Sequence, residues 1–565
     1  MRFRGQISVL LSLLMVSIAA LLGALLESAR LAAIQSMLSI SVHAAAESVL
    51  AEYNRELWEE YDLLFLDSGY GENGIRPEEV ERRAQGWLED RWTQKNTVLS
   101  AELGEVRLTG YKTAVDQGGE EFMRAIEKWL EFYWVKDWNE PTGGIGQRIG
   151  QGCACFQVVE KMAEAAEKAF SLEERMVKTA ELVREIEELE EEIDALPIPG
   201  PTADPGSNSG PGNESIKEDL EDDLDQKRQR MEDDIEAYTQ GLQEWEKCLE
   251  QVHQVWEDLE EEGKEQLPRR IKRRVEKMIK GYSQYDEDLR VRWQQVQAGE
   301  SVAWNNTLET MAPVLTEIRR RQCLPPMEWL LDCGPGWDGS AKAYGIRPPL
   351  WAKSLPSWEG KRADEGDGDG WVFARYVTEH FSCASRRGSR GSICEAEYIL
   401  TGEEGDRQAF EETLRRITAR LGGCTELEIL EDERRFRELT EFAGTLEASG
   451  SRNGVKALLP LLNAYLLNAQ GFEVALQNAE TLCRGETVKL RWENQLWEFN
   501  YEEFLRQMLE KDWDSALLYR CMGLIEHNLQ GLYPDFSLAQ CLGEIDLQAE
   551  TVGRFPGRAR IVMGY

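Results

Sequence analysis

The feature that most constrains this chain is an uncharged apolar stretch near its N-terminus, from Ile7 to Leu26. Three serines are its only polar residues. A helix of this length rises about 30 Å, which is the hydrocarbon thickness of a bilayer. A cleavable signal would be shorter and closely followed by a small-x-small site, whereas the nearest such run, Ala44–Ala46, lies well beyond the stretch. We therefore predict an uncleaved anchor in the lipid bilayer over residues 7–26.

The charges flanking this stretch predict its orientation. Arg2 and Arg4 precede it and Glu27 follows it, so the positive-inside rule keeps the N-terminus in the cytoplasm. The rest of the chain then lies outside the cell membrane, which excludes a cytoplasmic kinase or DNA-binding domain. Apolar residues continue beyond the stretch at helical spacing: Leu31, Ile34, Leu38, Val42, Val49 and Leu50. They predict that the helix leaves the membrane as a stalk; the alternative is a soluble helix buried in a large core.

The charge balance argues against nucleic acid as a partner. The chain of 565 residues carries 103 acidic and 65 basic residues, for a formal net charge of -38. Such a surface repels a phosphate backbone. With 18 Trp, 16 Tyr and 16 Phe there is enough apolar material for packed cores, so we expect folded domains rather than disorder.

Eleven cysteines predict disulfides if the body lies outside the cell, and their odd number leaves at least one without an intramolecular partner. The spacing favours three local pairs, although it does not fix the connectivity: Cys323 with Cys333, Cys383 with Cys394, and Cys521 with Cys541. The chain has no C-x-x-C motif and only four histidines, which argues against a zinc or other metal centre. We predict no cofactor and no nucleotide.

Two helical patterns around a Pro- and Gly-rich break predict an antiparallel helical hairpin. In the first arm, apolar residues from Leu182 to Leu196 recur at steps of three and four. In the second arm, residues from Ile235 to Leu259 do the same. Residues 197–215 form the break, which we expect to be a flexible tip. The outer positions of both arms are rich in Glu and Asp, so the hairpin should be acidic.

A basic stretch follows the hairpin. It runs from Arg269 to Lys280 and contains seven basic residues and one acidic residue. It could bind an anionic wall polymer. The interpretation that we favour is that it lies against the acidic hairpin and offsets the repulsion between like charges.

Beyond residue 321 the pattern predicts mixed α and β structure. Alternating apolar residues in Cys394–Leu400 predict a strand, and a helix capped by Asp406 should follow. Residues 545–551 and 559–563 alternate on either side of a Pro-Gly turn. We expect them to form a terminal β-hairpin.

Three Gly-rich motifs are expected to be structural. GYGENG at 69–74 and GPGWDG at 334–339 match G-x-G-x-x-G, but neither leads directly from a strand into a helix, so both should be turns. DEGDGDG at 364–370 resembles a calcium loop, yet Tyr376 stands where an EF-hand needs Glu; a looser calcium site is the alternative. There is no G-x-S-x-G elbow and no distinct carboxylate pair. We predict no catalytic residues.

Several sequence blocks resemble a family of uncharacterised bacterial proteins of the TadE/TadG type. At the N-terminal end these blocks are RGQISV, LLESARL and LAEYNRELWEEYDLLFLD, and at the C-terminal end they are CEAEYILTG, LYRCMGLIEHNLQ and YPDFSLAQCL. The family is associated with assembly of tight-adherence (Tad, or Flp) pili in Gram-positive bacteria. The resemblance implies an envelope-anchored accessory or minor pilin-like component without catalysis. It also implies leader processing after Gly5, although Leu10 stands where such precursors usually carry Glu.

The expected fold class is mainly α with a smaller α+β part. We expect four consecutive regions: an anchor and stalk helix over 1–60, an α-rich membrane-proximal region over 61–155, the hairpin over 156–320, and an α+β extracytoplasmic domain over 321–565. The expected function is that of a structural or accessory protein of a Tad-type pilus or related secretion apparatus, with other assembly proteins as partners. The alternatives are a cell-surface adhesin or wall-polymer binding module, and an external hydrolase.

Overall fold

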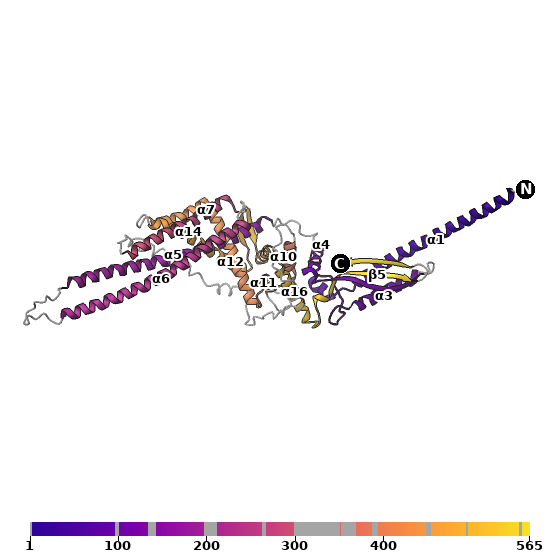
Figure 1. Cartoon of the computed structure of the whole chain (residues 1–565), viewed down its shortest axis with the longest axis horizontal. Helices are drawn as coiled ribbons and strands as arrows, with labels where there is room; N and C mark the ends of the chain where they lie inside the picture. Colours follow the sequence, from indigo (N-terminus) through magenta and orange to yellow (C-terminus); the bar gives the residue numbers. More distant parts are fainter. Residues whose placement is uncertain are drawn as a thin grey trace, which may run out of the picture. The chain divides into compact units, whose positions relative to one another are not determined.

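The structure is a computed structural model that describes residues 3–95, 101–133, 143–196, 212–262, 267–298, 351, 369–386, 394–447, 454–492, 495–552 and 556–565. It confirms a mainly α chain with a smaller β part (Figure 1). The chain forms two compact units. Unit 1 comprises Met1–Glu140, Asp338–Phe410 and Glu502–Tyr565, and unit 2 comprises Pro141–Trp337 and Glu411–Tyr501.

Unit 1 contains an antiparallel sheet and the helices around it. Its helices are α1 (Phe3–Leu50), α2 (Arg55–Tyr61), α3 (Pro77–Lys95), α4 (Glu120–Tyr133), α10 (Asp369–His380), α11 (Glu395–Thr401), the start of α12 (Asp406–Glu431), α15 (Tyr501–Lys511) and α16 (Ser515–Gln530). Its strands are β1 (Leu66–Asp67), β2 (Glu102–Thr113), β5 (Cys541–Val552) and β6 (Gly557–Gly564). The sheet therefore joins segments from both ends of the chain.

Strand β5 lies at the centre of this sheet. It pairs with β2 along one edge and with β1 and then β6 along the other, all antiparallel. The β5–β6 pair confirms the predicted terminal hairpin, and its register places Leu547 opposite Ile561. Ile545, Leu547 and Ala549 are fully buried on one face, while the intervening positions are more polar, as period-2 alternation requires.

The second half of α1 packs against this sheet. Ile34, Leu38, Val42 and Val49 are buried in one cluster with the apolar face of β5. The Tyr565 hydroxyl, at the C-terminus, donates a hydrogen bond to the Leu50 carbonyl. The predicted stalk is thus a component of the core of unit 1, and no linker separates it from the first half of α1.

Helix α3 protects the open edge of β2. The Val106 amide donates to Gln85 Oε1 at 3.0 Å and the Leu108 amide donates to Glu81 Oε1 at 2.8 Å. Side chains from the helix thereby occupy backbone donors that an edge strand would otherwise expose. Helix α3 begins at Pro77, and proline suits the first turn of a helix because the amide there needs no partner within the helix.

Unit 2 is built on a helical hairpin. It consists of α5 (Gly143–Ala195), α6 (Gly212–Glu262), α7 (Arg269–Gln297), the rest of α12, α13 (Glu433–Glu447), α14 (Gly454–Cys483), and the two-stranded hairpin β3 (Val488–Trp492) and β4 (Gln495–Phe499). Three contacts join the long helices: Lys168 to Glu244, Met176 to Tyr238, and Glu185 to Lys227. Along these three contacts the residue numbers of the α5 partners rise while those of the α6 partners fall. The two helices are therefore antiparallel, as predicted.

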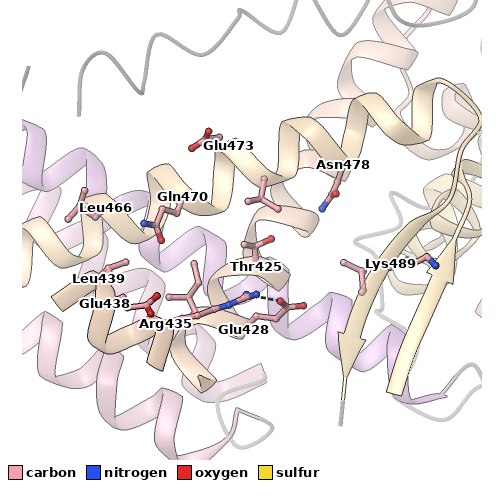
Figure 2. Close-up of a pocket in the computed structure, with 13 residues that line it drawn as sticks. Thr425, Glu428, Arg435, Glu438, Leu439, Leu466, Gln470, Glu473, Asn478 and Lys489 are labelled. Carbon is pink, nitrogen blue, oxygen red and sulfur yellow. Dashed lines mark hydrogen bonds and ion pairs between the residues drawn. The ribbon is translucent and has the colours of Figure 1, made fainter. Parts of the chain in front are cut away.

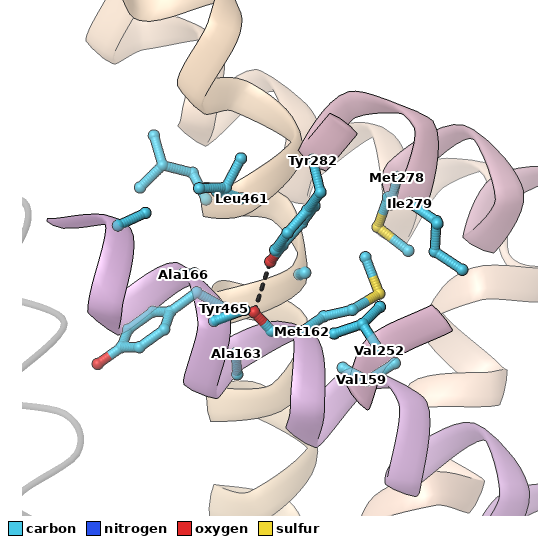
Figure 3. Packing of buried hydrophobic residues seen from close by; sticks show 14 of the residues in the cluster. Val159, Met162, Ala163, Ala166, Val252, Met278, Ile279, Tyr282, Leu461 and Tyr465 are labelled. Atoms are coloured by element: carbon cyan, nitrogen blue, oxygen red, sulfur yellow. Dashed lines mark hydrogen bonds between the residues drawn. The ribbon is translucent and has the colours of Figure 1, made fainter. Parts of the chain in front are cut away.

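The core of unit 2 forms where α5, α6, α7 and α14 meet (Figure 3). Tyr282 of α7 is fully buried, and its hydroxyl donates to the Met162 carbonyl of α5 at 2.5 Å. Further along α5, the buried Glu173 accepts hydrogen bonds from Tyr285 and Arg292 of α7, both at 2.7 Å. Each of these buried polar groups therefore has a partner.

Helices α5 and α12 cross at glycines. A Cβ atom added to Gly423 would lie 1.7 Å from the carbonyl oxygen of Gly152. A similar contact joins α7 and α14, because a Cβ added to Gly281 of α7 would lie 2.3 Å from the ring of Pro460, which stands within α14. The absence of side chains at these glycines sets how closely the helices approach.

The predicted strand at Cys394–Leu400 is wrong, since the structure has helix α11 there. All residues from Cys394 to Leu400 are buried, including two glutamates. A helix that is buried on every side has no polar face, so its sequence shows no helical period. The apolar residues of this segment alternate by chance, and this alternation resembled the pattern of a strand. The helix predicted next is confirmed: α12 begins at Asp406, and Phe410, Leu414, Ile417 and Leu421 are fully buried.

The four consecutive regions expected from the sequence also differ from the units observed. The region expected over 321–565 is divided between the units, because β5 and β6 pair with N-terminal strands while α12 to α14 pack on the hairpin helices. The expected tip at 197–215 lies largely outside the described residues.

Candidate functional site

The first half of α1 is the clearest functional feature. Every residue from Ile7 to Ala33 is exposed, and Leu10, Leu14 and Leu22 are more than half exposed. Among the described residues, this helix alone is long and apolar enough to cross a membrane. It is compatible with a single-span anchor over the predicted residues 7–26. Gly5, the predicted processing position, lies in its first turns.

Helices from distant parts of the sequence meet in unit 1 at a buried polar cluster. Asn528 of α16 donates from Nδ2 to the Tyr61 hydroxyl at 3.1 Å and to Glu395 Oε1 of α11 at 3.2 Å. Glu395 Oε2 also accepts from the amide and hydroxyl of Ser382. The neighbouring Tyr376 hydroxyl donates to the Tyr61 carbonyl at 2.9 Å. These bonds fix α2, α10, α11 and α16 to one another.

A histidine at the edge of this cluster is held on both sides. His380 Nε2 lies 3.1 Å from Asp62 Oδ2, and Nδ1 lies 3.1 Å from the Tyr376 carbonyl oxygen. Trp129 packs edge-on against the ring with centroids 5.0 Å apart. With both ring nitrogens engaged, the imidazole has no free nitrogen to act as a general base, so the arrangement supports a positional role.

In the part of the chain that the structure describes, the predicted pairs Cys383–Cys394 and Cys521–Cys541 are not bonded. Cys383, Cys394, Cys521 and Cys541 are buried free thiols, and Cys323 and Cys333 lie outside the described residues. Burial raises the pKa of the Cys383 thiol to about 12, with the nearby Glu397 carboxylate as a further cause. A thiol of this kind is protonated at neutral pH and is a poor nucleophile.

The Gly-rich motifs are placed as follows. GYGENG forms a turn between β1 and α3, as predicted, with Tyr70, Gly71 and Gly74 at positive φ. GPGWDG and most of DEGDGDG lie outside the described residues. Among residues that the structure describes, no group of His, Cys, Asp and Glu is arranged to hold a metal ion.

The basic stretch divides into a paired and an exposed side. Arg270 and Arg274 of α7 face the α12–α13 junction, where both contact Glu433, and Arg274 stacks on Phe436 at 4.0 Å. The acidic partner predicted in the hairpin arms is therefore wrong for these two arginines. The remaining side of α7 carries exposed cations that form no ion pair with any described residue: Arg269, Arg273, Lys277 and Lys280. We call these four residues the α7 basic stripe.

Unit 2 also contains a groove that the sequence did not indicate (Figure 2). Its volume is about 610 Å³, and helices α12, α13 and α14 and strand β3 line it. The apolar part of the lining consists of Ile429, Leu439, Leu466, Val474 and Leu490. The polar part consists of Thr425, Glu428, Arg435, Glu438, Gln470, Glu473, Asn478 and Lys489. The groove thus combines apolar side chains, most of them buried, with a larger number of polar groups.

Most charges around this groove are paired. Arg435 Nη1 donates to Glu428 Oε2 at 3.2 Å, and Lys489 lies 2.7 Å from Glu498 on β4. Glu438 pairs with Arg434. Glu473 is exposed and forms no ion pair with any residue in the described part of the chain. Gln470, Glu473 and Asn478 line the groove from α14, but this helix carries several other polar residues, so its sequence did not single out these three.

Comparison with known proteins assigns no activity. Residues 353–500 match a family of unknown function, DUF5702. No curated protein and no solved structure matches the chain. The matched residues include all of those that line the groove. Over this region the chain is thus similar to a family whose function is unknown.

Proposed function

We propose that this chain is a single-span membrane protein with an extracytoplasmic body, and that it serves as a structural or accessory component of a Tad-type pilus or related secretion apparatus. The observation that carries the proposal is the division of α1 into an exposed apolar half and a half packed in unit 1. A helix of this kind places the folded body directly at the membrane surface. The proposal assigns the protein no catalytic activity.

Transfer energies favour lipid as the environment of the exposed half. Leaving the fourteen exposed Leu, Ile, Val and Met side chains of this half in water would cost about 20 kcal/mol at roughly 1.5 kcal/mol each. The surface must therefore be covered by lipid or by the helices of neighbouring subunits. A static anchor uses the first environment, and a subunit that enters a filament uses the second.

The segments with TadE/TadG-like sequence provide further support. They belong to unit 1 together with α1, and Tyr61, Glu395 and Asn528 from three of them are joined by hydrogen bonds. Sequence blocks far apart in the chain thus form one structural element. Such a shared element is expected if the resemblance reflects a common membrane-proximal domain.

Deletion of the gene tests the proposal, with surface pili counted and measured by electron microscopy. We expect fewer or shorter pili, restored by the full chain but not by a chain lacking residues 1–33. Unchanged pili would contradict the proposal. N-terminal sequencing of the mature protein then distinguishes an intact N-terminus from processing after Gly5.

A second candidate function is binding of an anionic wall polymer through the α7 basic stripe. Its support is the exposure of four cations, without ion-pair partners in the described ranges, on one side of a helix in a chain of net charge -38. Retention on purified cell wall that falls with salt, and that is lost in Arg273→Glu/Lys277→Glu, would favour this function. Retention that does not change with salt would exclude it.

A further inference from the structure

One wall of the groove is an open strand edge. In the β3–β4 pair, Trp492 opposes Gln495 and Lys489 opposes Glu498. The Arg491 amide points away from β4 and donates to Glu428 Oε1 at 3.4 Å. Since antiparallel ladders alternate, the Lys489 amide and carbonyl also point away from β4, on the same edge as the Arg491 amide that reaches Glu428 in the groove lining. Neither group is bonded to another residue in the described ranges, so both can pair with another extended chain.

The opposite wall presents side-chain amides. Gln470 and Asn478 of α14 are half-buried, and both are directed into the groove (Figure 2). Neither amide group forms a hydrogen bond with another residue in the described ranges. A side-chain amide offers both a donor and an acceptor, which is what a peptide backbone requires. The groove therefore has hydrogen-bonding groups on both walls above an apolar floor.

The charge of the groove limits the ligand further. Because Arg435, Lys489 and Glu438 are already paired, the charge that remains on the rim is that of Glu473. A ligand complementary to this rim carries a basic side chain. The floor of Leu439, Leu466 and Leu490 accommodates an apolar side chain next to it.

We propose that this groove binds an extended peptide segment of a partner protein, which adds a strand to β3 at Lys489, places an apolar side chain on the floor and directs a Lys or Arg toward Glu473. Backbone pairing supplies affinity and the two side chains supply selectivity. The site lies wholly in unit 2, so the inference goes beyond the proposed pilus function and does not depend on it.

The test uses the full-length chain in detergent micelles and a phage-displayed library of random twelve-residue peptides as the probe. Enriched peptides are synthesised, and their affinity is measured by fluorescence anisotropy. We expect a shared motif with an apolar and a basic residue. Failure to enrich any motif, or a motif without the basic residue, would overturn the proposal.

Two proline variants form a matched pair. Lys489→Pro and Glu498→Pro both remove the Lys489–Glu498 ion pair, and both place proline where the amide points away from the hairpin ladder. Only Lys489→Pro blocks the groove edge. We expect it to weaken peptide binding at least tenfold while Glu498→Pro changes it less than twofold. Equal effects of both would overturn strand addition.

A charge exchange tests the site independently of hairpin stability. Glu473→Lys should weaken binding of the basic peptide at least fivefold. It should strengthen binding of the same peptide with its basic residue replaced by Glu. If the exchange leaves the preference of the protein unchanged, the peptide does not lie beside Glu473 and the proposal fails.

Discussion

At the scale of single residues, the informative positions are acids that the structure buries. Most of the 103 acidic residues could lie in solvent on helix faces, but Glu395, Glu397 and Glu426 are nearly or fully buried. Glu426 accepts one hydrogen bond from Asn468 Nδ2 at 3.3 Å, and its second oxygen has no partner among the described residues. Burial raises the pKa of the Glu426 carboxyl well above its ordinary value of 4.5.

Replacement of this carboxyl by an amide should stabilise the protein in a pH-dependent way. A raised pKa means that the folded state retains a proton that the unfolded state has lost above pH 4.5. The wild-type free energy of unfolding therefore falls by up to about 1.4 kcal/mol for each pH unit above that value, until the folded pKa is reached. Glu426→Gln removes this dependence. Urea unfolding of both proteins between pH 4.5 and 7.5 should show a difference that grows with pH; a constant difference would contradict the assignment.

The glycine crossing of α5 and α12 should not tolerate a methyl group. In Gly423→Ala the added carbon would clash with the Gly152 carbonyl oxygen, and this atom belongs to the backbone and cannot rotate away. We expect a loss of about 1–3 kcal/mol or more. Gly86→Ala in α3 is the control, because the added Cβ would meet nothing within 4 Å. This substitution should stabilise the helix slightly, since alanine has a higher helix propensity than glycine. Thermal unfolding compares them, and an unchanged midpoint for Gly423→Ala would show that the helices are further apart.

At the scale of elements, the distal hairpin should be separable from the core of unit 2. The buried cluster extends along α5 to Met176 and along α6 from Tyr238, and beyond these residues each helix packs on the other. Replacing residues 184–231 by a short Gly-Ser loop should leave the thermal midpoint within a few degrees of wild type, because this core remains intact. Circular dichroism measures both helix loss and cooperativity. A broad, non-cooperative transition would show that the arm stabilises the core.

An ion pair across the terminal hairpin should contribute modestly. Two hydrogen bonds from Arg560 Nε, at 2.9 and 3.0 Å, lower the pKa of the Asp546 carboxyl below its ordinary 3.8. The resulting stability is present above pH 3.8 and is lost as the pH falls through the folded pKa. Since the Arg560 side chain is largely exposed, we expect Asp546→Asn to cost about 1 kcal/mol at pH 7. Glu550→Gln, which affects the more exposed pair with Arg558, is the control and should cost less.

Elements with one solvent-facing side were predictable, and fully buried ones were not. The hairpin arms, α12 and the β5–β6 pair each have an apolar and a polar side, so their period is visible in the sequence. Helix α11 has no solvent-facing side, and the alternation of its apolar residues led to the wrong prediction of a strand. The groove was missed for a different reason. Its walls come from α12, α13, α14 and β3, and only tertiary packing brings these segments together.

At the scale of the whole molecule, the chain passes repeatedly between its two units. Unit 1 takes three segments and unit 2 takes two, so no linear division of the sequence could separate them. The exposed half of α1 is continuous with unit 1, whereas the acidic hairpin and the peptide groove belong to unit 2. We propose that the first unit attaches the protein to the membrane, and that the second binds a peptide segment of a partner.

The most direct test of this account is protease treatment of intact cells that express the full chain, followed by membrane fractionation. The account predicts that the chain sediments with membranes in high salt, and that external protease removes both units while a short fragment containing residues 7–26 stays in the membrane. A full-length chain that is soluble in the cytosol, or one that protease digests only after cell lysis, would contradict the anchor and its orientation.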